Sequence, residues 1–348
     1  MKLGTQSEAF NQAMARQTQS IFVADDIVVV TGGAGFIGSN IAKHLSEAGA
    51  RVVVCDRLGH GEKWRNLVGV SLHDVIRPEA LQSYLSSLAD KIPAIIHMGA
   101  ISSTTEQDVD RIVRDNLRAT LDLWDWTGAN GTRLVYASSA ATYGDGAMGF
   151  RDTIDLAYLS ALKPLNAYGW SKAAVDLRTA KEHAQGRERA QWAGLKFFNV
   201  YGPGEDHKGE MRSVINKIMP KILAGETIEL FKSHKSGYED GGQKRDFVYV
   251  NDCVAMVDWL LANPSINGLF NVGSGTARTF RDLATATFHS LEREPRIRYV
   301  DMPEVLRGKY QYFTEADMSQ TRAAGFIGGG TSLEAGIDAY VRQWTAAR

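Results

Sequence analysis

The feature that most restricts the fold is a glycine-rich turn between an apolar run and a helical pattern, in VVVTGGAGFIGSNIAKHL. Gly32, Gly35 and Gly38 follow the apolar run and open the helical pattern. Glycines at this spacing allow a tight turn, a close approach of the backbone to a pyrophosphate, and close packing of helix on strand. Asp56 ends the next apolar run, about 20 residues further on, where an acidic side chain can bind a ribose hydroxyl. This context predicts a dinucleotide-binding turn and disfavours an ordinary strand-to-helix connection.

Short apolar runs alternate with helical patterns up to residue 200. Between the runs, apolar residues recur three and four positions apart. Runs that are apolar throughout are typical of strands buried on both faces by crossover helices. We therefore expect an α/β fold with a doubly wound parallel sheet of the Rossmann type over residues 26–200. The expected strands are IVVVT (27–31), RVVVCD (51–56), AIIHM (94–98), RLVYASS (133–139) and LKFFNV (195–200).

The pattern becomes irregular after Tyr201, where the polar stretch KSHKSGYEDGGQKR (232–245) precedes DFVYV and GLFNVG. We expect residues 201–348 to form mainly a smaller C-terminal substrate-binding domain, with segments near 245–275 returning to the Rossmann domain. Residues 1–25 lack the continuous apolar segment of a signal peptide, so we interpret them as an N-terminal extension.

Composition excludes several classes of function. The 39 Lys and Arg residues balance 40 Asp and Glu residues, so overall charge does not favour nucleic acid or an anionic membrane. No apolar run reaches the roughly 18 residues of a membrane span. Cys55 and Cys253 do not have the spacing of metal ligands and are typical of buried thiols in a reducing compartment. We expect a cytoplasmic protein without a metal site that binds a small molecule through local groups.

The residues after the second expected strand give two conflicting indications of the dinucleotide. Asp56 alone favours NAD, because a carboxylate accepts a hydrogen bond from the adenosine ribose. Arg57 and Lys63, in DRLGHGEKWRN, favour NADP, because both cations can pair with a 2′-phosphate. Lys63 and Arg65 also fit a solvated loop. We prefer NADP, with NAD as the alternative.

A second motif, NAYGWSKAAVDL, places Tyr168 and Lys172 four residues apart at the start of a helical pattern, on one face. A lysine ammonium near a phenol, together with the charge of an oxidised nicotinamide, favours the phenolate and lowers the tyrosine pKa. Tyr168 can then accept the proton of an alcohol under oxidation, and Ser139, at the end of an expected strand, can orient the substrate oxygen. Elsewhere such a Tyr–Lys pair is usually a surface pair; the upstream glycine turn favours catalysis.

These motifs together resemble the extended short-chain dehydrogenase/reductase family, in TGGAGFIG, YASSAATYG, YGWSK, KFFNVYGP and RDFVYVND, from residue 26 to the end. The resemblance implies a bound NAD(P) that modifies nucleotide sugars, a catalytic triad of Ser139, Tyr168 and Lys172, and a structural Asn116 near the cofactor. The cofactor-binding residues so expected are Gly32, Gly35, Phe36, Ile37, Gly38, Asp56, Arg57, Lys63, Ala100, Ser102, Asn116, Tyr168, Lys172 and Val200.

The residues after Ser139 narrow the reaction. Dehydratases of the family carry an Asp-Glu pair there to eliminate water, whereas this chain has Ala140 and Ala141. An elimination is therefore disfavoured, and epimerisation or a net reduction remains.

The stretch NVYGPGEDHKGEM contains a second expected base. With SSTTE (102–106), SSAATYG and GKYQYFTEADM, it resembles the branch of the family that inverts the exocyclic C6″ carbon of a nucleotide-activated heptose through an aldehyde. Inversion at an exocyclic carbon presents the hydroxyl in two places, so a second proton donor and acceptor is useful. The resemblance assigns that role to Lys208, which would otherwise be interpreted as a solvated loop lysine.

The same resemblance implies anchors for the substrate. Arg245 matches the pyrophosphate clamp of the family, in keeping with bidentate guanidinium geometry. The chain departs from the family pattern in two places that bear on which sugar it binds. The loop from Phe231 to Arg245 is longer than usual, and Glu210 stands where a small polar residue is usual. The expected substrate-binding residues are Ser139, Asn199, His207, Glu210, Lys217, Phe231, Arg245 and Tyr310.

Three functions are compatible with the sequence. The preferred one is epimerisation of the activated heptose, for the inner core of lipopolysaccharide, by an enzyme that forms a homo-oligomer. The second is another nucleotide-sugar 4-epimerase or a reductase, in which Lys208 would be dispensable. The third, from a different class, is a non-catalytic NADP-binding regulator, which would not need Ser139, Tyr168 and Lys172.

Overall fold

The computed structural model describes residues 26–187, 189–307 and 310–346. The expected N-terminal extension, residues 1–25, lies outside the described residues. A seven-stranded sheet has the order β10-β6-β5-β4-β1-β2-β3 with every pairing parallel. Its strands are β1 (Ile27–Thr31), β2 (Arg51–Cys55), β3 (Leu72–Ile76), β4 (Ala94–His97), β5 (Arg133–Ser139), β6 (Trp192–Phe197) and β10 (Gly268–Val272). The doubly wound parallel sheet is thereby confirmed.

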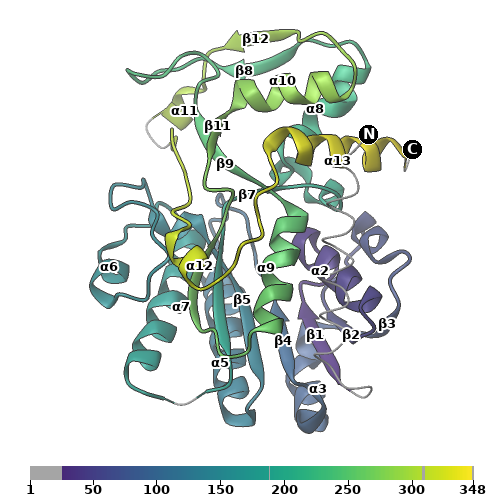
Figure 1. Ribbon diagram of the computed structural model, residues 1–348, viewed down its shortest axis with the longest axis vertical. Helices are drawn as coiled ribbons and strands as arrows, with labels where there is room; N and C mark the ends of the chain where they lie inside the picture. Colours follow the sequence, from purple (N-terminus) through teal and green to yellow (C-terminus); the bar gives the residue numbers. More distant parts are fainter. Residues whose placement is uncertain (1–25, 188, 308–309, 347–348) are drawn as a thin grey trace.

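Helices cover both faces of this sheet, which explains why its central strands are apolar throughout (Figure 1). All five residues of β1 are buried. One apolar cluster joins the sheet to α2 (Phe36–Glu47) and α9 (Val250–Ala262). A second cluster joins the opposite face to α3 (Leu81–Ser87), α5 (Ala119–Asn130) and α7 (Ala167–Ala184). Burial of these two clusters stabilises the layered arrangement and fixes where each strand ends.

The strand order reverses between β1 and β4, which pair in register from Val28 with Ala94 to Thr31 with His97. The connections from β1 and from β4 leave in opposite directions, so a crevice opens beyond their carboxyl ends. Ligands of open α/β sheets bind at such a switch point.

The remaining strands form two small sheets. One has the order β11-β9-β7 and the other pairs β12 with β8. The strands are β7 (Asn199–Tyr201), β8 (Ile228–Phe231), β9 (Lys244–Tyr249), β11 (Ala277–Thr279) and β12 (Ile297–Val300). Together with α8 (Val214–Leu223), α10 (Phe280–Ser290) and α13 (Leu333–Ala346) they surround a third apolar cluster, drawn above the large sheet in Figure 1.

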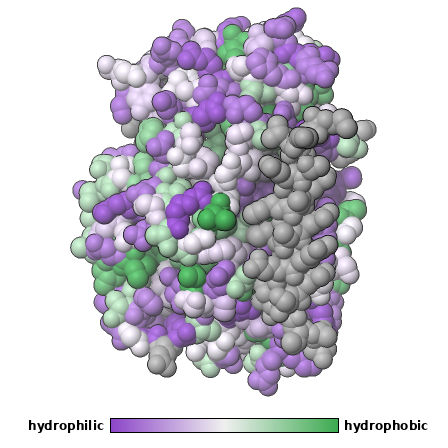
Figure 2. Space-filling model, viewed as in Figure 1, coloured by the Kyte–Doolittle hydropathy of each residue, from purple (hydrophilic) through white to green (hydrophobic). Residues whose placement is uncertain are grey.

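Short helical elements complete the described chain. They are η1 (Glu62–Leu67), η2 (Pro78–Ala80), η3 (Ala89–Lys91), α4 (Val109–Ile112), η4 (Val113–Arg118), η5 (Ala140–Tyr143), α6 (Leu156–Ala161), η6 (Asp206–Met211), α11 (Glu304–Arg307) and α12 (Ser319–Ala323). None of the described helices combines the length and apolarity that crossing a membrane requires. Figure 2 shows hydrophilic and apolar residues intermixed on one face, with the part that holds the small sheets mainly hydrophilic.

The structure differs from the sequence-based expectation in two places. The run LKFFNV does not form one strand, because the chain leaves the large sheet after Phe197 and Asn199 begins β7 of a different sheet. Strand β3 was not expected, since its central residues are exposed and it has no apolar run. The chain after Tyr201 forms regular elements, and its strand β10 lies at the edge of the large sheet, within the segments near 245–275 expected to return there.

Candidate active site

A cavity of about 580 Å³ lies beyond the carboxyl ends of β1, β4 and β5 and reaches the small sheets. It brings together residues that are far apart in the sequence and that the motifs single out. The expected residues among its lining are Gly32, Gly35, Phe36, Ile37, Gly38, Asp56, Lys63, Ala100, Ser102, Ser139, Tyr168, Lys172, Asn199, Val200, His207 and Lys208.

The glycine turn has the geometry that a bound pyrophosphate requires. Gly32 has φ +63°, and its amide donates to the Cys55 carbonyl at 2.8 Å. A Cβ on Gly38 would lie 2.2 Å from the Gly32 carbonyl oxygen, so a side chain there would break the turn. Gly35 immediately precedes α2 and provides no side-chain cap, which leaves the first amides of the helix for an anion. The residues present therefore fit a dinucleotide.

Asp56 is held by three donors at the end of β2. The Ala34 amide donates to Oδ2 at 3.0 Å, while the Arg57 amide and the Lys63 ammonium donate to Oδ1 at 2.7 and 2.5 Å. The Lys63 side chain lines the cavity. The guanidinium of Arg57, in contrast, pairs with Glu79 at 2.9 Å on a half-exposed surface outside the cavity lining.

Ser139, Tyr168 and Lys172 meet because β5 ends where α7 begins. The Asn166 side chain caps α7 by accepting from the Gly169 amide at 2.8 Å, which fixes the first turn that carries Tyr168. Lys172 follows one turn later and is 1% exposed. Its ammonium has no hydrogen-bond partner among the described residues. An unpartnered buried cation beside a phenol leaves an electrostatic role for a ligand or for the phenolate.

The protonation equilibria of this pair are set mainly by burial. Burial lowers the pKa of Lys172 to about 8, and the charge of Asp176 opposes that change. Burial also raises the pKa of Tyr168, which a hydrogen bond with Ser139 lowers and the charge of Asp176 raises. In the protein alone, burial thus opposes the lowering expected for the Tyr168 pKa.

Asn116 lies outside the cavity lining and shapes its wall. Its Oδ1 accepts from the Ile101 amide at 2.8 Å, and its Nδ2 donates to the Ile101 carbonyl at 3.0 Å and to Ser171 Oγ at 3.4 Å. It thereby ties the segment after β4, which contributes Ala100 and Ser102 to the cavity, to helix α7. The contacts of Asn116 are thus with the backbone of Ile101 and with Ser171, and its role toward the cofactor stays a prediction.

Lys208 reaches the same cavity from η6. Its ammonium lies 5.3 Å from the centroid of the Phe36 ring. Burial lowers the pKa of Lys208, and the nearby charge of Glu205 opposes that change. A lysine with a lowered pKa is a better general base near neutral pH than a solvated one.

Two residues that the sequence did not indicate hold the loop of Lys208. Asn66 on η1 donates from Nδ2 to the Gly204 carbonyl at 2.9 Å and to the Ala34 carbonyl at 3.0 Å, and lies 3.2 Å from His207 Nδ1. Glu205 is fully buried and accepts from Ser213 Oγ at 2.7 Å. Asn66 contacts Gly204 and His207 across more than a hundred residues of sequence, so no local motif marks it, whereas Glu205 acts locally on Ser213.

Several expected substrate residues lie outside the cavity lining. Glu210 and Lys217 pair with each other at 3.2 Å, and the Glu210 side chain is 95% exposed. Glu210, which stands where a small polar residue is usual, therefore points to solvent and is neutralised by Lys217.

Arg245, Tyr310 and Phe231 form a separate cluster beside the cavity. The Arg245 guanidinium lies 5.3 Å from the centroid of the Tyr310 ring and 5.8 Å from that of Phe280, which lines the cavity. Phe231 packs edge-on against Tyr310 at 6.4 Å. A cation between aromatic faces at the cavity edge can bind a phosphate and a flat base.

Comparison with known proteins places this architecture in a family. Residues 28–273 match the NAD dependent epimerase/dehydratase family. An ADP-L-glycero-D-manno-heptose-6-epimerase of Nitratidesulfovibrio vulgaris (strain DP4) is 50% identical over 322 residues, which cover 92% of this chain and 98% of the relative.

Solved structures of similar proteins have the same fold. The Helicobacter pylori ADP-L-glycero-D-manno-heptose-6-epimerase superimposes with a TM-score of 0.76 at 26% identity, covering 93% of this chain and 97% of the other. The Thermus thermophilus UDP-glucose 4-epimerase, solved as a complex with NAD, does so with a TM-score of 0.73 at 26% identity, covering 92% and 100%. The chain therefore belongs to the NAD-dependent epimerase/dehydratase family, as its motifs predict.

Proposed function

We propose that the protein interconverts the two C6″ epimers of ADP-glycero-manno-heptose by oxidation to an aldehyde and re-reduction. The observation that carries this proposal is the entry of Lys208 into the cavity that holds Ser139, Tyr168 and Lys172. An epimerase that acts on a ring carbon can turn its keto sugar over and reuse one tyrosine, whereas inversion of an exocyclic carbon is served by bases at two positions. The names of the similar proteins support the same substrate.

The cofactor would lie along the glycine turn and the Asp56 pocket. A bound nicotinamide dinucleotide would supply the hydride acceptor and donor. Its pyrophosphate would be bound by the amides at the start of α2. Lys63 supports NADP, because its ammonium lies in the cavity and already occupies one oxygen of Asp56.

The proton chemistry follows from the two bases. Tyr168 would take the hydroxyl proton of one epimer while Lys172 holds the phenolate and Ser139 orients the substrate oxygen. Lys208, as a neutral amine, would serve the other epimer, which its lowered pKa favours. Arg245 and Tyr310 would bind the diphosphate and nucleotide at the cavity edge.

We further propose how the chain divides into domains, where in the cell the protein works and how it assembles. Residues 26–200 would bind the cofactor, and residues 201–348 would mainly bind the substrate. The product would feed the inner core of lipopolysaccharide. We place the protein in the cytoplasm, because Cys55 and Cys253 are both buried and unpaired, as is usual in a reducing compartment. A homo-oligomer remains a prediction.

The direct test is to incubate the purified protein with ADP-D-glycero-D-manno-heptose and to follow C6″ inversion by NMR. The cofactor should copurify and should not be consumed, because the substrate regains what it gives up. UDP-glucose serves as the comparison substrate. Conversion of UDP-glucose to its C4 epimer, without action on the heptose, would favour the 4-epimerase alternative. Stoichiometric oxidation of added NADPH would indicate a reductase.

A further inference from the structure

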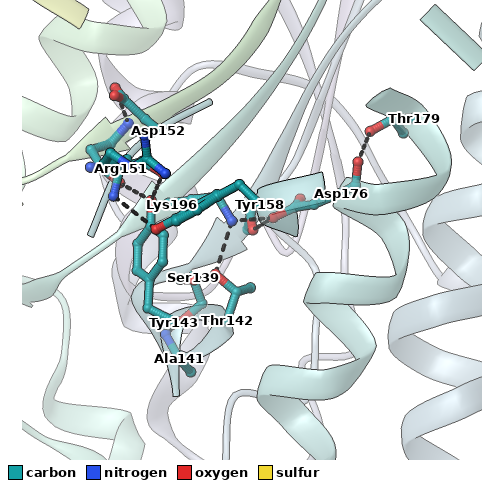
Figure 3. Close-up of polar contacts among 12 residues, drawn as sticks. Ser139, Ala141, Thr142, Tyr143, Arg151, Asp152, Tyr158, Asp176, Thr179 and Lys196 are labelled. Carbon is teal, nitrogen blue, oxygen red and sulfur yellow. Dashed lines mark hydrogen bonds and ion pairs between the residues drawn. The ribbon is translucent and has the colours of Figure 1, made fainter. Parts of the chain in front are cut away.

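Figure 3 shows a buried ion pair of Lys196 and Asp176, with Thr142 and Ser139 beside it. The ammonium of Lys196, on β6, lies 2.5 Å from Asp176 Oδ2, on α7, and both side chains are fully buried. Lys196 also donates to Thr142 Oγ1 at 2.9 Å and lies 4.9 Å from the centroid of the Tyr143 ring. Each charge is therefore satisfied inside the protein.

Asp176 is the centre of this network. Its Oδ2 accepts from Ser138 Oγ at 2.6 Å as well as from Lys196, and its Oδ1 accepts from the Tyr136 hydroxyl at 3.1 Å. Tyr136 and Ser138 come from strand β5 and Lys196 from its neighbour β6, so the carboxylate links α7 to both strands.

The network touches the proposed site through its nearest neighbours. Asp176 follows Lys172 by one helical turn, which places both on the same face of α7. Ser138 immediately precedes Ser139, and Thr142 donates to the Ser139 carbonyl at 2.8 Å. A change of charge at Asp176 or Lys196 therefore alters the electrostatic potential near Tyr168 and Lys172.

The charge of Asp176, the partner of Lys196, is one of the influences on the pKa of Tyr168. The carboxylate of Asp176 raises the pKa of Tyr168, which opposes formation of the phenolate, and it also raises the pKa of Lys172, which keeps that ammonium charged. His97 adds no charge, because burial and then Lys172 lower its pKa to about 3. The titratable or charged groups near Tyr168 and the ion pair are Lys172 and Asp176 on α7, Lys196 on β6, His97 on β4, Tyr136 on β5, Tyr143 on η5, Lys208 on η6, and Asp152 and Tyr158 behind Tyr143.

We propose that Lys196 is a positioning residue of the acid–base machinery: its ammonium cancels the charge of Asp176, so that the charge of Lys172 acts on Tyr168 undiminished. This inference rests on the proposed role of Tyr168 as a base. Asp176 then aligns β5 with α7 without an electrostatic penalty for the phenolate. A buried ion pair is weak ground for stability alone, since well-packed apolar side chains often stabilise a core as well or better.

The test titrates Tyr168 in the purified protein with its bound cofactor, by phenolate absorbance minus that of the matching Tyr168→Phe protein. Lys196→Met should move the midpoint to higher pH, because Asp176 is then uncompensated. Lys196→Arg should keep it near the wild-type position. The double variant Lys196→Met with Asp176→Asn should return it toward that position, because both charges are gone. A merely structural role predicts no return in the double variant.

Activity gives a second readout. The epimerisation rate of Lys196→Met at pH 7 should fall about tenfold or more and recover as the pH rises toward 8, below which Lys172 keeps its charge, with circular dichroism unchanged. If Lys196→Met does not fold, Asp176→Asn replaces it and should move the Tyr168 midpoint to lower pH. A midpoint equal to that of the wild type, in whichever single variant folds, overturns the proposal. If the wild-type protein epimerises no heptose, the proposed function fails, and the phenolate titration still decides the role of Lys196.

Discussion

Lys208 places its ammonium 5.3 Å from the centroid of the Phe36 ring, so a loop lysine from the second half of the chain lies against the first residue of α2. Phe36 belongs to the glycine turn expected to hold the cofactor. The contact therefore connects the proposed second base with the dinucleotide-binding turn, across the cavity that also contains Tyr168.

If Tyr168 and Lys208 each serve one epimer, removal of either base should reduce epimerisation to a similar extent. Tyr168→Phe and Lys208→Met should each reduce epimerisation by about 10²–10⁴-fold, because a complete cycle needs both bases. Each variant should still dismutate an aldehyde analogue, since oxidation of one molecule and reduction of another can use the remaining base. NMR of both reactions distinguishes the two effects.

Lys217→Met is the matched control, because Lys217 is a lysine of the same region that pairs with Glu210 outside the cavity lining. It should epimerise at close to the wild-type rate. A Lys208→Met protein with that rate would leave Lys208 as a loop lysine and favour a ring-carbon epimerase.

The choice of dinucleotide should depend on Lys63 more than on Arg57. Lys63→Ala should weaken NADP binding about tenfold or more and NAD binding less, because a charge-assisted contact with the 2′-phosphate is lost. Arg57→Ala should have a smaller effect, since that guanidinium is engaged by Glu79. Affinities can be measured by fluorescence titration of the apoprotein. Arg65→Ala, on the same turn but paired with Glu62, is the control, and equal losses for both dinucleotides would exclude a 2′-phosphate contact.

The glycine turn should tolerate no side chain at Gly38. Gly38→Ala would place a Cβ 2.2 Å from the Gly32 carbonyl, against backbone that cannot move without opening the turn. The variant should purify without its cofactor, as read from the absorbance of the denatured supernatant. Gly61→Ala is the control, because nothing lies within 4 Å of its Cβ position. Normal cofactor content in Gly38→Ala would refute the assignment of the turn.

The parts of the fold that the sequence predicts are those with a local physical cause. The central strands are apolar because both faces are buried, and the glycine turn is visible because close backbone contacts exclude side chains. Strand β3 escaped prediction because an edge strand with an exposed centre needs no apolar run. LKFFNV was expected as one strand, since apolarity does not reveal that the chain changes sheets after Phe197.

The residues of the candidate site also divide into those that the sequence predicts and those that only the tertiary fold reveals. Tyr168 and Lys172 are four residues apart on one helix, so their proximity follows from the sequence alone. The support of Lys208 by Asn66, and the pairing of Asp176 with Lys196, join segments that only the tertiary fold brings together. Exposure could not be predicted either, and Glu210 proved to point away from the cavity.

Acid stability should depend on Glu182 of α7. Burial raises its pKa, but hydrogen bonds from Trp124 and Arg178 and the charges of Arg178 and Arg187 outweigh burial and hold the pKa at about 2. The folded-state pKa lies below the unfolded value, so the stabilisation is full above about pH 4.5 and is lost as the pH falls toward 2. Glu182→Gln should lower the free energy of unfolding by about 2 kcal/mol at pH 7.

Urea denaturation at several pH values checks this expectation. The difference between the wild type and Glu182→Gln should shrink as the pH decreases below 4.5. Glu62→Gln is the control, because its partner Arg65 is exposed and surface pairs contribute about 0–1 kcal/mol. A difference that does not vary with pH would contradict the low pKa of Glu182.

The Tyr168 half-reaction should have an alkaline limit that is set by Lys172. Burial lowers the pKa of Lys172 to about 8, opposed by Asp176, so the ammonium that holds the phenolate is present below about pH 8 and is lost above it. Dismutation by Lys208→Met isolates this half-reaction from titration of Lys208. The dismutation rate of Lys208→Met should decline above about pH 8. Lys172→Arg in the same background replaces the ammonium with a guanidinium, which stays charged at that pH. Any activity that this variant keeps should therefore show no such decline. A decline that begins only near the ordinary lysine pKa of 10.5 would mean that Lys172 is not the desolvated cation of this site.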